Sequence, residues 1–183
     1  YATCPANLPA SQRRVFNVTA VTSQKALSTQ PQAPGELVFN NRGPQSDFIS
    51  TLNGVMYVRS EDLDSNGVLK AGVPIEPLIL RANAGDCIEV NLTNKIDPSS
   101  RVFSHNFKWA PPFNITVPDP SNPGQQMPAY NSKMSRYVGL HPQLLSYDAA
   151  TSTGWNIGWN SKGRADQFAN FNETVKYQWY AGK

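Results

Sequence analysis

The chain has 183 residues, of which 39 % are hydrophobic, 10 % aromatic and 16 % charged, a composition that excludes a disordered protein and suits one globular domain. The net charge of +3 comes from scattered lysines and arginines, and Arg13-Arg14 is the only adjacent basic pair, which argues against a nucleic-acid-binding surface. No window reaches the roughly 18 apolar residues that a membrane-spanning helix requires. The chain begins at Tyr1 without an initiating Met, as a processed or excised product does.

Short strands are predicted in the first 60 residues. Three segments combine apolar or aromatic residues with flanking turn-forming residues: Val15–Ala20, Glu36–Phe39 and Val55–Val58. In the first segment, Phe16, Val18 and Ala20 face one way, whereas Asn17 and Thr19 face the other. This period of two is typical of a strand with one buried face.

The next segment predicts a hairpin. It comprises a strand over Pro77–Arg81, a glycine-containing turn over Ala82–Asp86 and a second strand over Cys87–Leu92. In the second strand we expect Ile88, Val90 and Leu92 to point into the core, with Glu89 and Asn91 pointing outward.

The second half of the chain predicts further strands separated by irregular segments. In order, these are a proline-rich loop over Trp109–Pro128, strands over Tyr137–His141 and Leu144–Tyr147 interrupted by Pro142, a polar connection over Asp148–Asn170, and an alternating strand over Thr174–Tyr180. Several short strands without a helical period favour an all-β sandwich or barrel. We therefore expect one all-β domain over residues 1–183.

Two features favour an exported protein, secreted or periplasmic. Cys4 and Cys87 can form one disulfide, which persists in an oxidising compartment, although two reduced buried cysteines would fit a cytosolic protein. Four Asn-x-Thr sequons are candidates for glycosylation in a eukaryotic secretory pathway, at Asn17, Asn91, Asn114 and Asn172.

Three segments in the portion from residue 70 to 183 resemble the cupredoxin domains of multicopper oxidases. The hairpin from Pro77 to Asn94 resembles the early Gly-Asp hairpin of that family. Gly139-Leu-His-Pro-Gln143 resembles its His-x-His strand, and Tyr177-Gln-Trp-Tyr-Ala-Gly182 is similar to the Tyr-x-Trp strand of the ceruloplasmin-like and large manganese-oxidase-like branches. Residues 1–70 would supply N-terminal strands and connections.

The resemblance implies a cupredoxin-like Greek-key sandwich within a secreted multicopper oxidase. Such a protein couples one-electron oxidation of a metal ion or a phenolic substrate to reduction of dioxygen, with copper as its cofactor. Its remaining domains or chains would be the partners of this one. The chain stops just after the Tyr-x-Trp strand, so we expect the sandwich to be incomplete at its C-terminal end.

The departures from the family pattern concern the copper ligands. Gln143 replaces the second histidine of the His-x-His motif, and an amide is a poor copper ligand beside an imidazole. His141 is left as the candidate metal ligand, while His105 is better explained as a loop histidine. A type 1 copper site needs two histidines and a thiolate, and Cys87 lies in the wrong part of the chain for that thiolate. We therefore expect a mainly structural domain with no catalytic residue of its own.

Other functions receive less support. The alternative to an oxidase domain is a non-catalytic extracellular binding or assembly module that keeps the cupredoxin scaffold without metal. Asp62–Gly67 opens like a calcium-binding loop, but the twelfth position is Val73 rather than glutamate, so a polar turn explains it better. Tryptophans and tyrosines near the C-terminus could line a sugar-binding surface, although aromatic residues of β proteins usually pack within the fold. No nucleophile motif of a hydrolase is present.

Overall fold

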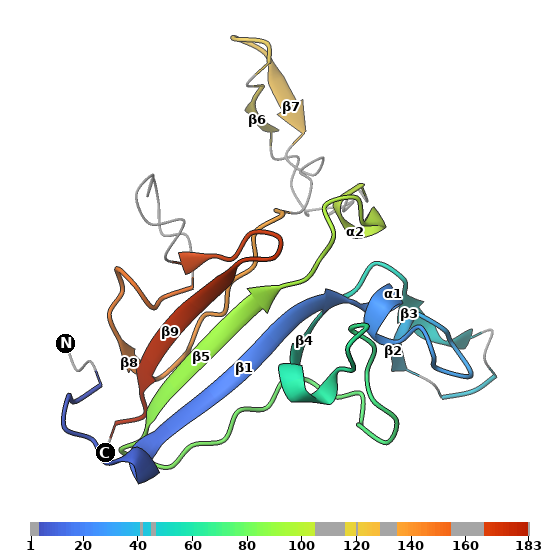
Figure 1. Cartoon of the computed structure of the whole chain (residues 1–183). Helices are drawn as coiled ribbons and strands as arrows, with labels where there is room; N and C mark the ends of the chain where they lie inside the picture. The colour runs from blue at the N-terminus through green and yellow to red at the C-terminus, as the bar shows by residue number, and fades with distance from the viewer. Residues whose placement is uncertain are drawn as a thin grey trace.

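A computed structural model describes residues 4–40, 42–44, 47–104, 116–119, 121–128, 135–154 and 167–182. Within these residues the largest sheet has five strands in the order β4-β1-β5-β9-β8 (Figure 1). The strands are β1 (Arg13–Thr22), β4 (Val55–Arg59), β5 (Cys87–Asn94), β8 (Ser146–Tyr147) and β9 (Thr174–Tyr180). β1 and β5 run parallel and the other neighbours run antiparallel, so the sheet is mixed.

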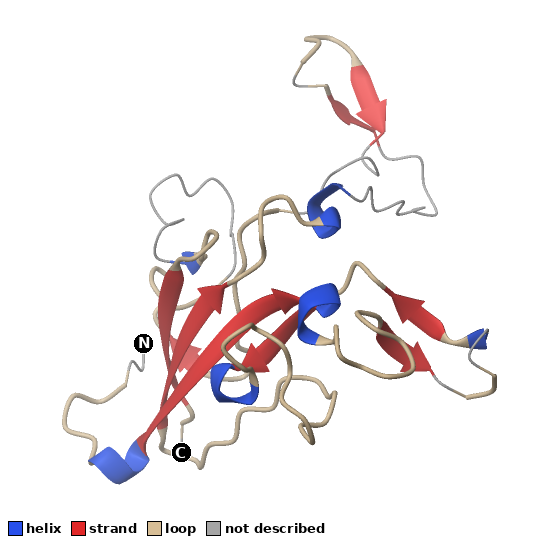
Figure 2. Cartoon of the chain, turned by 45° about the vertical axis from the view of Figure 1, so that its right-hand side comes forward, coloured by secondary structure: helices blue, strands red, loops and turns tan. Residues whose placement is uncertain are grey.

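Small elements surround this sheet. Among the described residues, two strand pairs lie outside it, β2 (Leu37–Asn40) with β3 (Ile49–Thr51) and β6 (Thr116–Pro118) with β7 (Gln126–Pro128). The helices are single turns: α1 (Ser23–Ala26), α2 (Arg101–Ser104), η1 (Ala10–Gln12) and η3 (Ser60–Asp62). Figure 2 shows that loops make up most of the chain around the sheet. No helix in the described ranges has the length and apolar character to cross a membrane.

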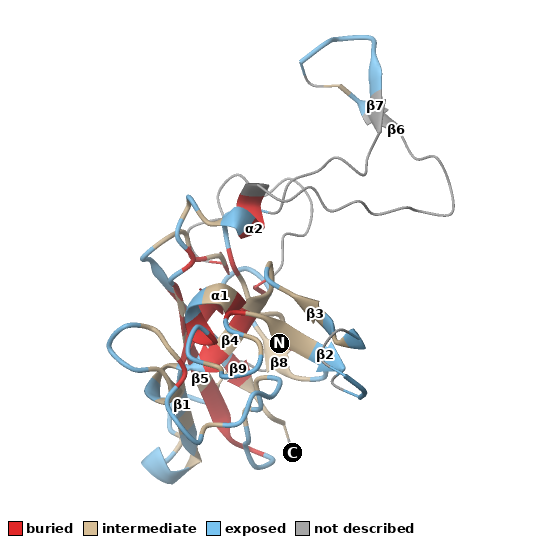
Figure 3. Ribbon diagram, turned by 90° about the vertical axis from the view of Figure 1, so that its right-hand side faces the viewer, coloured by how far each residue is buried: buried red, intermediate tan, exposed pale blue. Residues whose placement is uncertain are grey.

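The main core covers one face of the sheet. Val18 and Ala20 of β1, Val90 and Leu92 of β5, and Tyr177 of β9 are all fully buried there. In the described chain the layer above them consists of the short helix α2 and irregular segments rather than a second sheet. It includes Ile96, Val102, Phe103, Val138 and Ala169, with Leu78 and Leu80 at its margin. Figure 3 shows the buried residues concentrated along the central strands.

The opposite face of the sheet is polar over β5 and β9. Asn91 Nδ2 donates a hydrogen bond to Asn17 Oδ1 over 3.0 Å, and Lys176 Nζ pairs with Glu89 Oε2 over 2.7 Å. At the β1–β4 end the same face carries a smaller apolar cluster, formed by Val21, Ala26, Leu27, Met56, Val58 and Leu69. We call the surface formed by Asn17, Glu89, Asn91, Thr93, Thr174, Lys176 and Gln178 the polar face.

The strand predictions are confirmed for the long alternating segments. Val15–Ala20 lies within β1, Val55–Val58 within β4, and Thr174–Tyr180 is β9; the segment predicted over Glu36–Phe39 is β2, one residue later. Within β5, Ile88, Val90 and Leu92 are buried, and Glu89 and Asn91 lie on the polar face, as their alternation predicts. The chain is β-rich as expected.

Three predicted elements differ in the structure. Pro77–Arg81 is extended but is not a strand, because residues 74–82 make no backbone–backbone hydrogen bond with any described residue. Pro74 and Pro77 supply no N–H donor for a ladder. The strand predicted around Pro142 is reduced to β8 and an isolated bridge between Val138 and Ala169. The predicted irregular loop over Trp109–Pro128 contains β6 and β7 in its described part.

Candidate functional site

The loop from Gly139 to Gln143 lies between the Val138–Ala169 bridge and β8, at the covered face of the sheet. Its backbone is fixed from two sides. Tyr57 of β4 donates its hydroxyl hydrogen to the carbonyl of Gly139 over 3.1 Å. Leu140 packs against the main core. The loop is therefore held by side chains from the sheet rather than by a ladder of its own.

His141 is half-buried and has a defined orientation. Its Nδ1 lies 2.7 Å from the carbonyl oxygen of Thr153, and its ring meets Tyr147 edge-on at a centroid distance of 6.0 Å. Because a carbonyl oxygen only accepts, Nδ1 must carry the proton, and Nε2 carries the lone pair of the neutral ring. Metal-binding histidines are commonly oriented by a carbonyl in this way.

Two glycines allow the contact between His141 and Thr153. The backbone of Gly154 adopts φ +59°, and a Cβ there would lie 1.8 Å from the carbonyl oxygen of Leu140. A Cβ on Gly139 would lie 2.6 Å from the carbonyl oxygen of Gly154. The two backbones thus approach at a separation that only glycine permits. Thr153 and Gly154 were not predicted as parts of the site, since nothing in their local sequence relates them to residue 141.

The buried side chain of Gln167 holds the backbone of residues 150 and 154, next to the contact between His141 and Thr153. Its Oε1 accepts from the Gly154 N–H over 2.9 Å, and its Nε2 donates to the carbonyl of Ala150. Tyr177 Oη donates to the Gln167 carbonyl over 2.5 Å. Burial raises the pKa of Tyr177 and that of Tyr57, so both phenols stay protonated and act as hydrogen-bond donors. These groups serve to position the loop.

The residues present do not fit a complete copper site. Gln143 is exposed and separated from His141 by the buried Pro142. Cys87 is joined to Cys4 with a Cα–Cα distance of 5.5 Å, as the sequence predicted, so it offers no thiolate. Among the described residues, no three His, Cys, Asp or Glu side chains are grouped to hold a metal ion. His141 can supply one ligand and no more.

Other predicted candidates have varied positions. His105, Asn114, Trp155 and Trp159 lie outside the described residues. Trp179 is buried, stacks on Tyr177 at 5.6 Å and donates from Nε1 to the Ser152 carbonyl, which makes it a packing residue. In the Asp62–Gly67 segment, Asp64 Oδ1 accepts from the backbone N–H groups of Asn66 and Val68. That carboxylate closes a polar turn.

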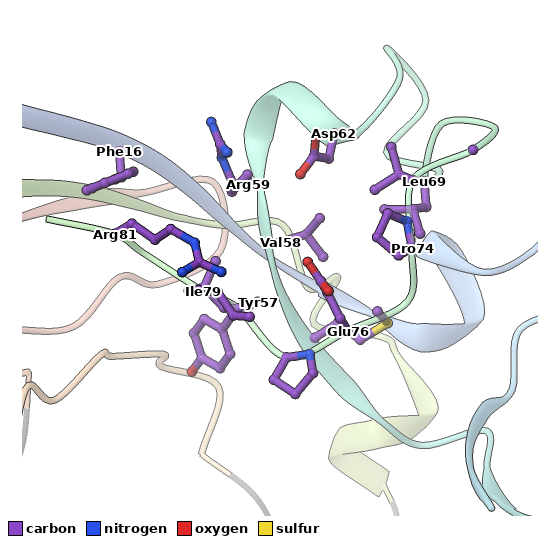
Figure 4. Close-up of a pocket in the computed structure, with 15 residues that line it drawn as sticks. Phe16, Tyr57, Val58, Arg59, Asp62, Leu69, Pro74, Glu76, Ile79 and Arg81 are labelled. Carbon is purple, nitrogen blue, oxygen red and sulfur yellow. The ribbon is translucent and has the colours of Figure 1, made fainter.

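A groove of about 440 Å³ lies between β4 and the extended segment that follows Gly72 (Figure 4). Its charged lining residues are of both signs: Arg59, Asp62, Glu76 and Arg81. Arg59 is paired with Glu61. No histidine, cysteine or serine is among its described lining residues.

The disulfide and an ion pair with a buried carboxylate fix the start of β5. Arg14 Nε donates to Asp86 Oδ2 over 2.8 Å, and the Asn83 N–H donates to the same oxygen over 2.9 Å. The Asp86 side chain is only 3 % exposed. The hydrogen bond from Arg14, followed by that from Asn83, lowers the pKa of this carboxyl. Asp86 is thus ionised and anchored next to Cys87.

Comparison with known proteins adds no assignment. No protein-family model matches the chain, and a search of the curated proteins finds no match either.

Proposed function

We propose that this chain is a cupredoxin-like, Greek-key portion of a secreted multicopper oxidase, in which it has a mainly structural role. In this proposal the parent protein oxidises a metal ion or a phenolic substrate and reduces dioxygen. The coppers are held by its remaining domains or chains, and His141 contributes at most one ligand.

The proposal is supported by where the three family-like segments lie. They are separated along the sequence, yet β5 pairs with β9 from Cys87–Tyr180 to Thr93–Thr174. β8 follows the His141-Pro142-Gln143 loop directly and pairs with β9 on its other side. The strands β5 and β9, which belong to two of the family-like segments, are therefore neighbours in one sheet, and the His141 loop leads into β8 at the edge of that sheet (Figure 1).

The orientation of His141 supports the part of the proposal in which this residue supplies one copper ligand. A half-buried imidazole whose Nδ1 is held by a backbone carbonyl has the orientation that metal-binding histidines commonly have. A single imidazole does not make a copper site, so any copper near His141 would need its other ligands from the remaining domains or chains. The chain's own residues hold and orient that ring.

The first experiment is elemental analysis of copper in natively purified, assembled material that contains this chain. Several coppers per assembly are expected. His141→Ala, compared with Gln143→Ala as a matched change in the same loop, then tests the ligand role. A loss of one copper on His141→Ala alone supports ligation by His141, whereas equal copper in both variants removes it. Material without copper contradicts the oxidase proposal.

A second candidate function is a non-catalytic extracellular binding or assembly module. The observation that favours it is the missing ligand set, because Gln143 is exposed and Cys87 is bridged to Cys4. Copper-free native material that co-purifies with a defined protein or glycan would support this second function.

A further inference from the structure

The polar face leads into a cleft of about 710 Å³ at the end of β5 and β9. The cleft is lined mostly by polar side chains, among them Thr19, Lys25, Asn66, Lys95 and Asn172, and by one half-buried aromatic ring, Phe171. Its volume lies within the range of clefts that bind small molecules. Asp64 and Asp97 add carboxylates to the lining. An aromatic ring among hydroxyl, amide, ammonium and carboxylate groups is suited to a sugar, which presents an apolar C–H face and a rim of hydroxyls.

Asn172 lies on the rim of this cleft and begins the sequon Asn172-Glu173-Thr174. The turn that carries it is firmly held. The Glu173 N–H donates to the Asn170 carbonyl over 2.9 Å, and the Asn172 N–H donates to the Asn94 carbonyl over 2.8 Å. Asn172 has φ +62°, a left-handed conformation that asparagine tolerates well. The side chain is thus presented from a fixed backbone.

The oxygen and the nitrogen of the Asn172 side-chain amide differ in their hydrogen bonds. Oδ1 accepts a hydrogen bond from Lys95 Nζ over 3.0 Å. Among the described residues nothing accepts a hydrogen bond from Nδ2, the atom to which an N-linked sugar attaches. A sugar on Nδ2 would therefore leave the contact with Lys95 intact.

The other described sequons differ from this arrangement. Asn17 and Asn91 lie opposite each other on neighbouring strands, and Asn91 Nδ2 already donates a hydrogen bond to Asn17 Oδ1. Both stand on the polar face, next to the Glu89–Lys176 ion pair. Neither of them lines the cleft.

We infer that Asn172 is an N-glycosylation site whose first N-acetylglucosamine packs in the cleft against Phe171 and stabilises the fold. The co-reactant is a lipid pyrophosphate-linked oligosaccharide. Asn172 Nδ2 forms a bond to C1 of its first sugar, the bond from C1 to the pyrophosphate oxygen breaks, and the lipid pyrophosphate leaves. The displaced amide proton passes to a base of the transferase. The transfer precedes folding, and the cleft receives the sugar as the turn forms.

The test uses the full chain, directed to the secretory pathway of a eukaryotic cell, with Asn17, Asn91 and Asn114 changed to Gln so that one sequon remains. Glycopeptide mass spectrometry is expected to find Asn172 occupied. Trimming the glycan to its first sugar is expected to leave Tm unchanged. Asn172→Asp, which keeps an oxygen for Lys95 and tolerates positive φ, lacks the sugar and is expected to have a lower Tm.

Phe171→Ala tests the packing. It is expected to lower Tm by about 3 °C more in the glycosylated chain than in the Asn172→Asp chain. An unoccupied Asn172 in secreted, folded protein would overturn the inference, as would equal effects of Phe171→Ala in both backgrounds. If Phe171→Ala is not secreted, trimmed and fully deglycosylated wild-type protein are compared instead, and equal Tm values contradict the inference. None of these outcomes depends on copper.

Discussion

Gly154 shows how a single residue controls the candidate site. A Cβ at this position would overlap the Leu140 carbonyl, and the backbone has positive φ in addition. Gly72 also has positive φ, +82°, but a Cβ there would meet nothing within 4 Å. Alanine substitutions at these two glycines therefore distinguish the cost of a positive φ, present at both, from the cost of a steric clash, present only at Gly154.

We predict that Gly154→Ala lowers the free energy of unfolding by at least about 3 kcal/mol, because the clash adds to the strain of the left-handed conformation. Gly72→Ala should cost only about 1 kcal/mol, from the conformation alone. Urea unfolding of both variants measures the difference. Similar losses would mean that residues 139–140 and 153–154 can move apart freely.

Asp86 predicts a specific pH dependence of stability. Its pKa in the folded state is lowered by Arg14 and the Asn83 N–H, below the value of about 3.9 in an unfolded chain. The folded state then binds fewer protons, so the contribution of Asp86 is present above pH 4 or so and is lost as pH falls through the folded pKa. Asp86→Asn should flatten the decline of unfolding free energy below about pH 4.

Urea unfolding at a series of pH values measures this slope. Asp97→Asn is the matched control, because Asp97 is exposed and its carboxylate bonds only to Ser99 among the described residues. The pKa of Asp97 is lowered by the hydrogen bonds from Ser99 but not by an arginine. We therefore expect Asp97→Asn to change the pH dependence of the unfolding free energy less than Asp86→Asn does. A slope unaltered by Asp86→Asn would show that the Arg14–Asp86 ion pair does not couple folding to protonation of Asp86.

Among the elements, β5 depends most directly on a covalent link. Cys87 is its first residue, and the disulfide to Cys4 spans 83 residues of sequence. We predict that reduction, or the double change Cys4→Ala with Cys87→Ala, lowers the free energy of unfolding by roughly 2–5 kcal/mol. Denaturant unfolding with and without reductant measures the loss. A reduced protein of equal stability would contradict this assignment of the bridge.

How much of each element could be predicted depends on whether its cause is local. The faces of β5 and β9 were predictable, because alternation within one strand decides them. The parallel pairing of β1 with β5 was not, since no local pattern specifies a partner 74 residues away. The strand predicted over Pro77–Arg81 did not form: Leu78 and Leu80 are partly buried against the main core, yet this segment has no strand to pair with among the described residues. The contact of His141 with Thr153 depends on tertiary packing, so no local sequence pattern could predict it.

Across the whole molecule, stability should decrease outward from β5. β5 is paired on both sides and carries four buried core residues, Cys87, Ile88, Val90 and Leu92. The β2–β3 pair lies outside the main sheet and exposes Phe39 and Ile49. We predict that amides of β5 exchange with solvent at least about tenfold more slowly than those of β2 and β3. Exchange followed by mass spectrometry measures this, and uniform rates would contradict it.

The parallel pairing of β1 and β5 also determines when the sheet can assemble. Asn17 and Asn91 are 74 residues apart, and Thr93 and Thr174, partners across β5 and β9, are 81 apart. During synthesis, β1 must wait for β5, and β5 must wait for β9. Such a high contact order predicts slow folding with edges exposed in the interval. The Cys4–Cys87 bridge closes almost the same loop as the β1–β5 pairing, so forming it early would shorten that wait by removing much of the loop-closure entropy.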